Sequence, residues 1–107
     1  MFNSNVKNVS AEEAYKLINE DKEFIILDVR TKEEYDGGHI PGAKLIPVQV
    51  LPGKIDELDE YKDKPVLVYC ASGGRSPRAV DMLVDNDFMN IYHLSRGISS
   101  WRYNVTR

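Results

Sequence analysis

The chain has 107 residues and a mass of 12.2 kDa, a length that favours one domain over residues 1–107. Its 17 acidic and 14 basic residues give a net charge of -3, which argues against nucleic-acid binding because such binding needs a basic face. No apolar run reaches the roughly 18 residues of a membrane helix, and the N-terminal MFNSNVKNVS lacks the apolar stretch of a signal peptide. We therefore expect a cytoplasmic protein that binds neither nucleic acid nor membrane.

The cysteine count limits the chemistry further. Cys70 is the only cysteine in the chain, which excludes an internal disulfide and a cysteine-cluster zinc site. Only two histidines, His39 and His93, accompany it. We expect neither a bound metal nor a cofactor.

Short apolar runs alternate along the chain with amphipathic stretches. A weak strand is expected at residues 6–9, and Ser10 then begins a helix, because Glu13 three residues later completes a capping-box pattern. The continuous apolar run 24–27 predicts a strand buried on both faces. Thr31 is expected to cap the next, short helix, which runs through Tyr35. The later expected elements are a short strand at 43–46, a helix at 51–61, a buried strand at 65–69, a helix at 75–86, a strand at 90–94 and a short closing helix at 98–103.

This alternation predicts an α/β protein with about five strands in a mainly parallel sheet and helices on both faces. Ligands of such sheets bind at the carboxyl ends of the strands. Two candidate positions follow: Asp28, after the strand at 24–27, and Cys70, after the strand at 65–69.

The most informative segment is the loop Cys70-Ala71-Ser72-Gly73-Gly74-Arg75-Ser76, which lies between a buried strand and a helix. Small residues let successive N–H groups turn toward one point and bind an anion. The helix N-terminus adds partial positive charge, and Arg75 adds a cation. Such surroundings lower the pKa of a thiol, so we expect Cys70 to be a thiolate near neutral pH.

A cysteine after an apolar strand is most often an inert buried residue, but this polar, glycine-rich loop favours a catalytic one. Arg75 points the same way, because an arginine at a helix start is unfavourable against the helix dipole unless an anion binds nearby. Arg78, one turn later, either faces the same site or lies in solvent.

Several segments resemble the rhodanese (sulfurtransferase) family, in order and over essentially the whole chain. They are Ile26-Leu27-Asp28-Val29-Arg30 followed by Glu33-Glu34-Tyr35, then Gly38-His39-Ile40-Pro41-Gly42-Ala43, the loop Cys70–Ser76, and Leu94-Ser95-Arg96-Gly97 with Trp101. One departure is Arg96, where the family more usually has a second glycine.

The resemblance implies a rhodanese-like fold and a two-step mechanism without a cofactor. Cys70 would take the outer sulfur of a small anionic donor, such as thiosulfate or a polysulfide, and become a persulfide. An external thiol, cyanide or a partner protein's cysteine would then accept that sulfur. No general base is needed if Cys70 is already ionised, which suits a loop without histidine or acid.

The resemblance also implies a role for each site residue. Cys70 is the nucleophile, and Ala71, Ser72, Gly73, Gly74 and Arg75 bind the donor. Asp28, Arg30 and His39 are expected to support the scaffold, with Arg30 and Glu34 as a candidate pair that His39 joins. Tyr69 and Trp101 are expected to pack in the core. The uncharged Ala71 suggests a modest affinity for thiosulfate.

Three alternatives stay open. Cysteine phosphatases and arsenate reductases are disfavoured, because phosphatase loops read C-x5-R whereas Cys70 to Arg75 reads C-x4-R, and because no acid lies near the loop to protonate a leaving alcohol. A non-catalytic regulatory module is disfavoured by the intact cysteine loop. A persulfide carrier that hands sulfur to one partner protein would use the same residues.

Overall fold

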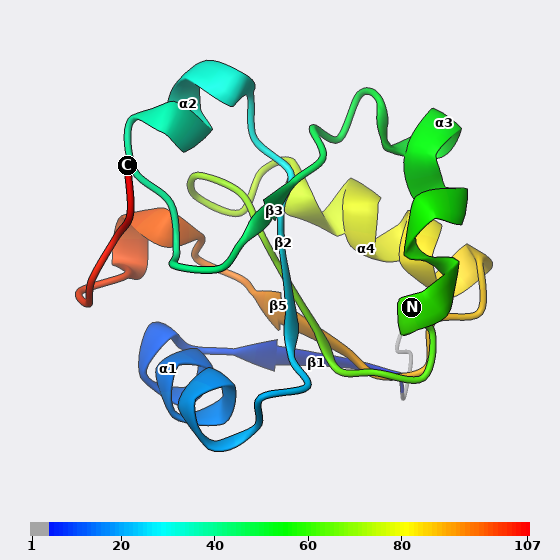
Figure 1. Cartoon of the computed structure of the whole chain (residues 1–107), viewed down its shortest axis with the longest axis horizontal. Helices are drawn as coiled ribbons and strands as arrows, with labels where there is room; N and C mark the ends of the chain where they lie inside the picture. Colours follow the sequence, from blue (N-terminus) through cyan, green and yellow to red (C-terminus); the bar gives the residue numbers. More distant parts are fainter. Residues whose placement is uncertain (1–4) are drawn as a thin grey trace.

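The computed structural model describes residues 5–107, so the first four residues of the expected domain 1–107 lie outside the described residues. Within the described part, five strands form one sheet in the order β1-β5-β4-β2-β3, and every neighbouring pair is parallel (Figure 1). This confirms the α/β class and the predicted parallel sheet. The strands are β1 (Val6–Val9), β2 (Ile25–Asp28), β3 (Lys44–Leu45), β4 (Val66–Tyr69) and β5 (Ile91–Leu94).

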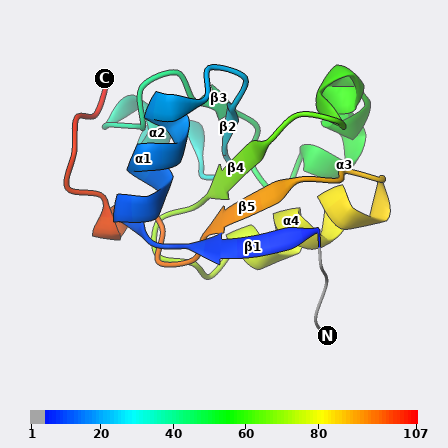
Figure 2. The ribbon, with the colours of Figure 1, turned by 90° about the horizontal axis from the view of Figure 1, so that it is seen from below.

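Helices cover both faces of the sheet, as Figure 2 shows for α1 and α4 on opposite sides of β1, β5 and β4. One apolar core lies between the sheet and the helices α3 (Leu51–Lys54) and α4 (Ser76–Asp85) together with the 3₁₀ helix η1 (Ile55–Tyr61). A second core lies on the opposite face, beneath α1 (Ala11–Glu20), α2 (Lys32–Asp36) and the 3₁₀ helix η2 (Ile98–Ser100).

The two predicted helix starts are confirmed. Ser10 Oγ accepts a hydrogen bond from the Glu13 N–H, and the Glu13 carboxylate accepts one from the Ser10 N–H. Thr31 and Glu34 make the same reciprocal pair at the start of α2. These capping boxes satisfy N–H groups that a helix start leaves without partners.

Two predicted helices are shorter or differently wound than expected. The segment 51–61 is one α-helical turn followed by a 3₁₀ helix, in which Ile55 and Leu58 are both buried. A spacing of three places two side chains on one face of a 3₁₀ helix, so this winding buries the same apolar pair. The closing helix at 98–103 ends at Ser100, because the backbone of Trp101 is extended.

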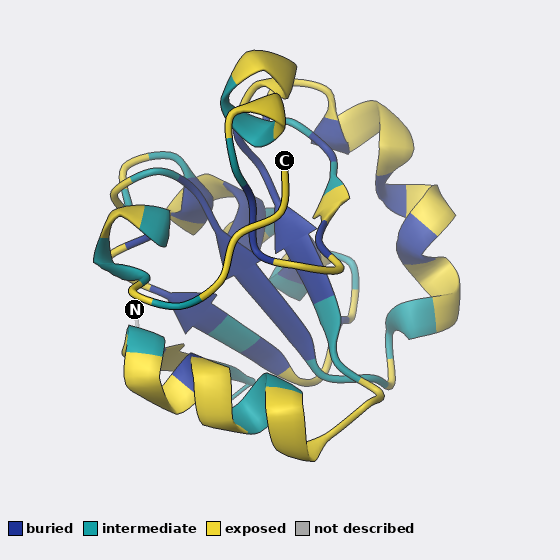
Figure 3. Cartoon of the chain, turned by 60° about the vertical axis from the view of Figure 1, so that its left-hand side comes forward, coloured by how far each residue is buried: buried dark blue, intermediate teal, exposed yellow. Residues whose placement is uncertain are grey.

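The centre of the sheet carries the site. All four residues of β4 are buried, and Figure 3 shows the central strands as the most buried part of the chain. Asp28 lies opposite Tyr69 in the β2–β4 register, so the polar ends of β2 and β4 meet at one edge. No helix of the described residues is long and apolar enough to cross a membrane.

Candidate active site

Cys70 directly follows β4 and lies almost fully buried, with 1% of its surface exposed. Its Sγ accepts hydrogen bonds from the N–H groups of Gly73, at 3.1 Å, and Ser76, at 3.4 Å. The Ser76 Oγ lies 3.3 Å from the same sulfur. The loop and the first turn of α4 therefore converge on the sulfur, as the sequence predicts.

Two glycines make this loop possible. Gly73 has φ +100°, and a Cβ there would overlap the Ser95 carbonyl. Gly97 has φ +68°, and a Cβ there would overlap the carbonyls of Cys70 and Ala71. Both residues need the left-handed region and a close approach of two backbones, which glycine alone accommodates without strain.

The turn after β5 holds the start of the cysteine loop through two backbone hydrogen bonds. The Ile98 N–H donates to the Cys70 carbonyl at 3.0 Å, and the Ser99 N–H donates to the Ala71 carbonyl at 2.9 Å. These two bonds hold the start of the loop against η2, so the position of the sulfur is set by backbone contacts.

Opposing influences act on the acidity of Cys70. Burial raises the pKa of the thiol, but hydrogen bonds from the Ser76 hydroxyl and from the N–H groups of Arg75, Ser76 and Gly73 outweigh burial and hold the pKa below its ordinary value. A lowered pKa increases the fraction of thiolate, which is the nucleophilic form.

Arg75 has an anionic partner within the chain. Its guanidinium donates two hydrogen bonds to the Glu34 carboxylate of α2, at 2.7 and 2.9 Å. These bonds, together with those from Thr31, lower the pKa of Glu34 to about 2 although burial opposes the shift. The Arg75 side chain is 39% exposed, so the guanidinium remains within reach of a ligand from solvent.

The expected pairing of Arg30 with Glu34 is wrong. Arg30 forms a buried, bidentate pair with Asp28, with Nη2 2.7 Å from Oδ2. Its Nη2 also donates to the Gly38 carbonyl at 2.8 Å. The end of β2 favours this pair because Asp28 and Arg30 are two residues apart, whereas Glu34 faces Arg75. Asp28 and Arg30 thus join β2 to the turn after α2, which is a scaffolding role.

His39 does not join that pair. Its ring stacks on Tyr35, with centroids 3.6 Å apart, and its Nδ1 lies 2.9 Å from the Tyr35 carbonyl oxygen. Its backbone forms an antiparallel bridge with Thr106. His39 therefore anchors the C-terminal segment beside α2, where Figure 1 places the chain end.

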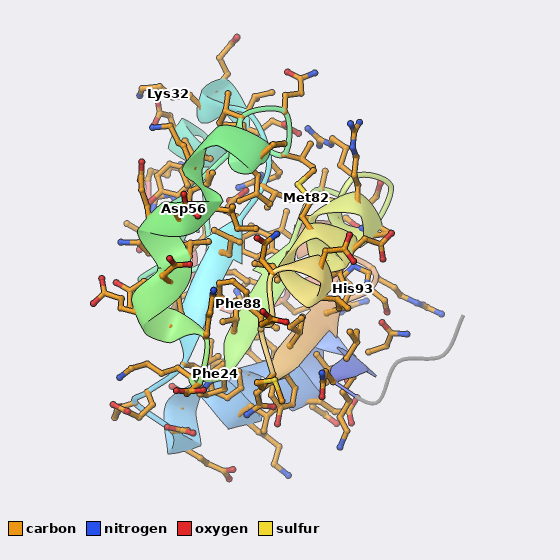
Figure 4. The ribbon with its side chains drawn as sticks, turned by 90° about the vertical axis from the view of Figure 1, so that its right-hand side faces the viewer. Phe24, Lys32, Asp56, Met82, Phe88 and His93 are labelled. Carbon is orange, nitrogen blue, oxygen red and sulfur yellow. The ribbon has the colours of Figure 1, made fainter. Side chains whose placement is uncertain are left out.

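Sequence reasoning missed a line of polar side chains beneath the sulfur. Ser76 Oγ lies 2.6 Å from His93 Nε2, and His93 Nδ1 lies 3.1 Å from Asn8 Oδ1. His93 is 8% exposed on β5, and Figure 4 shows it beside α4. The available signal was a histidine inside an otherwise apolar strand, since the interior of such a strand rarely holds an unpartnered polar ring.

The remaining residues of the predicted site differ in how exposed they are. Ala71 is partly buried, whereas Ser72, Gly74 and Arg78 are exposed. Their part in donor binding stays a prediction. Tyr69 is fully buried, and Trp101 packs partly buried against the core beneath α1. Among residues 5–107, no group of three or more histidine, cysteine or acidic side chains could hold a metal ion.

Fold and site together define a class: a parallel α/β sheet that presents a cysteine within a loop of N–H donors at a helix start. A model of the family described as "Rhodanese-like domain" matches residues 10–104. The chain therefore belongs to the rhodanese-like domain family.

Individual relatives agree with this assignment. A sulfurtransferase of Allochromatium vinosum is 29% identical over 96 residues, which cover 90% of this chain and 88% of that protein. The crystal structure of a rhodanese-related protein from Thermoplasma volcanium has 34% identity and a TM-score of 0.82, covering 94% of this chain and 97% of that one. A tRNA uridine(34) hydroxylase of Erwinia tasmaniensis is 35% identical over 83 residues, but the match covers only 24% of that protein.

Proposed function

We propose that this protein is a sulfurtransferase that carries sulfane sulfur as a persulfide on Cys70. The observation that carries the proposal is the surroundings of Sγ at the start of α4: the N–H groups of Gly73 and Ser76 donate to the sulfur, and the Ser76 hydroxyl lies 3.3 Å from it. Such a cradle stabilises negative charge on whichever sulfur occupies it. The relationship to the sulfurtransferase of A. vinosum supports the same reaction class.

The proposed chemistry has two displacements. The Cys70 thiolate attacks the sulfane sulfur of thiosulfate or a polysulfide, forming a new S–S bond while the donor's S–S bond breaks. Sulfite, or a shortened polysulfide, leaves with the bonding electrons. In the second step cyanide or an external thiolate attacks the outer sulfur of the persulfide, and Cys70 leaves as a thiolate. Dividing the transfer between two steps is covalent catalysis.

Alternatives within the family make different predictions. A persulfide carrier would load in the same way but discharge mainly to one protein partner. A non-catalytic module would not load at all. A phosphatase or arsenate reductase would leave the sulfur-loading test negative and hydrolyse a phosphate ester or reduce arsenate instead.

The decisive experiment is mass spectrometry of the intact protein after incubation with thiosulfate or polysulfide. We expect the mass of one added sulfur atom, located at Cys70 and removed by a reducing thiol. Failure of every sulfane donor to add sulfur would overturn the proposal.

The matched variant is Cys70→Ser, which keeps the size of the side chain but is far less nucleophilic at neutral pH. We expect it to fold and to show neither loading nor turnover. Turnover by this variant would place the chemistry on another group.

A further inference from the structure

His93 is a buried titratable group that the mechanism above does not use. It stands on β5, between Asn8 of β1 and Val68 of β4 in the sheet register. Side chains alternate along a strand, so its ring lies on the α4 face of the sheet, where Ser76 meets it. Three successive contacts then connect it in one line with the reactive sulfur: Sγ to Ser76 Oγ at 3.3 Å, Oγ to Nε2 at 2.6 Å, and Nδ1 to Asn8 Oδ1 at 3.1 Å.

The proton inventory of this line allows only two arrangements. Ser76 has a single hydroxyl hydrogen, so its Oγ can donate to His93 or to Cys70 but not to both. When the hydroxyl donates to Nε2, Oγ can only accept a hydrogen bond from Cys70. This arrangement favours the protonated thiol of Cys70. When Nε2 carries a proton and donates to Oγ, the hydroxyl turns to Sγ, and the line favours the thiolate.

Asn8 decides which form of His93 accompanies each arrangement. The Asn8 Oδ1 is an acceptor and therefore holds a hydrogen on Nδ1. With Nδ1 protonated, a neutral ring has its lone pair on Nε2 and accepts from Ser76. A ring that donates through Nε2 as well must be an imidazolium.

We propose that Ser76, His93 and Asn8 form a proton relay that converts Cys70 and His93 from a neutral thiol and imidazole into a thiolate and an imidazolium. The S–H bond of Cys70 breaks and its proton binds Ser76 Oγ, while the original Ser76 proton moves to Nε2. The electron pair stays on Sγ, and no other reactant takes part. His93 acts through Ser76 and is a positioning residue.

The proton transfer between Cys70 and His93 does not itself require the proposed sulfur transfer. Only the role that we give it in the catalytic cycle rests on the proposed function. A thiolate becomes an anionic persulfide and then a thiolate again, so the cradle holds one negative charge throughout the cycle. An imidazolium behind Ser76 balances that charge at each stage and keeps the hydroxyl pointed at the sulfur.

Among the described residues, the surroundings leave Cys70 as the titrating partner of His93. His93 is paired with Val68 of β4 in the sheet register, and its ring contacts Ser76 of α4, which in turn contacts Cys70. Lys7 precedes Asn8 in β1, and Tyr92 precedes His93 in β5. Successive side chains of a strand point to opposite faces, so Lys7 and Tyr92 point away from the face that holds the His93 ring. Burial lowers the pKa of His93, which keeps the ring neutral unless a thiolate forms nearby.

The charged residues of α4 are exposed: Arg78, Asp81 and Asp85. Arg75, just before α4, is paired with Glu34.

The first test measures the rate of Cys70 alkylation by iodoacetamide as a function of pH in wild type and His93→Leu. The relay predicts that His93→Leu raises the pKa of Cys70, because the thiolate loses its imidazolium. Below that pKa the alkylation rate falls about tenfold for each unit of the rise. If His93 instead stays neutral and only accepts a hydrogen bond from Ser76, His93→Leu should lower the pKa of Cys70, because the Ser76 hydroxyl is then free to donate to the thiolate. An unchanged or lowered pKa therefore overturns the relay.

His39→Leu is the matched control. His39 and His93 are each 8% exposed, but His39 contacts Tyr35 and Thr106 rather than the line to the sulfur. We expect the wild-type alkylation profile from this variant. An equal shift in both variants would mean a general effect of losing a buried histidine, which contradicts the relay.

The second test is reciprocal and does not require a His93 variant to fold. Nuclear magnetic resonance follows the His93 ring through a pH titration in wild type and in Cys70→Ala, with His39 as an internal reference. Coupled groups shift each other's titration, so we expect Cys70→Ala to lower the pKa of His93, while the His39 ring signals are the same in the two proteins at each pH. A His93 titration that is the same in both proteins overturns the relay. Neither test uses a sulfur donor, so both outcomes are independent of the loading experiment.

Discussion

At the scale of single residues, the cation expected to bind the donor already has a partner. Arg75 and Glu34 are about one-third exposed, at 39% and 33%, and ion pairs this exposed contribute only about 0.2–1 kcal/mol. In the proposed function, an anionic donor such as thiosulfate would compete with the Glu34 carboxylate for the same guanidinium. We expect the pair to moderate donor affinity instead of abolishing it.

This competition predicts that Glu34→Gln lowers the KM for thiosulfate. Glutamine keeps the capping box of α2 but removes the competing charge, so the expected gain is at most about fivefold. Arg75→Ala should act in the opposite direction and raise the KM. Steady-state kinetics with thiosulfate and cyanide measures both, and a KM that moves in the same direction in the two variants would contradict the competition.

The same pair has a predictable dependence on pH. Arg75 holds the pKa of Glu34 at about 2, below its value in an unfolded chain. The contribution of the pair to stability is therefore fully present above the unfolded-state pKa and is lost as the pH falls toward about 2. Denaturant unfolding across this range should show a smaller acid loss of stability in Glu34→Gln than in wild type. Equal losses would mean that the pair contributes nothing measurable.

At the scale of elements, local signals and distant contacts differ in how far sequence predicts them. The capping boxes at Ser10 and Thr31 join residues three apart, so the sequence alone predicts them. The pair of Arg75 with Glu34 joins residues 41 apart. It depends on β2 and β4 being neighbours in the sheet, which brings α2 and the loop together. The local sequence pattern did not indicate where Glu34 points.

The line beneath the sulfur was still harder to predict. Asn8 and His93 are 85 residues apart, and His93 and Ser76 are 17 apart. Their meeting depends on the order β1-β5-β4 and on a register that places Asn8 opposite His93. A shift of one residue would turn the histidine to the other face of the sheet. Register of this kind is set by packing, so a single sequence carries little sign of it.

The loop itself offers a comparison between neighbouring glycines. Gly73→Ala forces a Cβ against the Ser95 carbonyl at φ +100°, and such strain costs on the order of 1–3 kcal/mol. Gly74 has open space and no positive φ, so Gly74→Ala should change stability by no more than about 1 kcal/mol. Denaturant unfolding of the two variants checks this difference, and equal effects on stability would show that the loop relaxes around the added methyl group.

At the scale of the whole molecule, Cys70, the proposed nucleophile, lies at the centre of the sheet's carboxyl edge and is 1% exposed. Cys70 is the only cysteine of the chain, so no second thiol of the same molecule can resolve a persulfide. Discharge must be intermolecular. A persulfide would place its outer sulfur about 2 Å beyond Sγ, so the acceptor has to reach that atom rather than Sγ itself.

Burial and the lack of a second thiol together predict the behaviour of protein that has been loaded and then freed of donor and thiols. It should keep its extra sulfur on standing, because the N–H groups around the cradle stabilise the anion and nothing within the chain can attack it. Cyanide or a dithiol should remove the sulfur, since both are small enough to approach an almost buried group. A folded protein with a surface cysteine should remove the sulfur more slowly than a small dithiol at the same thiol concentration, because Cys70 is almost fully buried. Mass spectrometry over time measures all three rates. If the loaded protein alone lost its sulfur as fast as it does with cyanide, the cradle would not be protecting the persulfide.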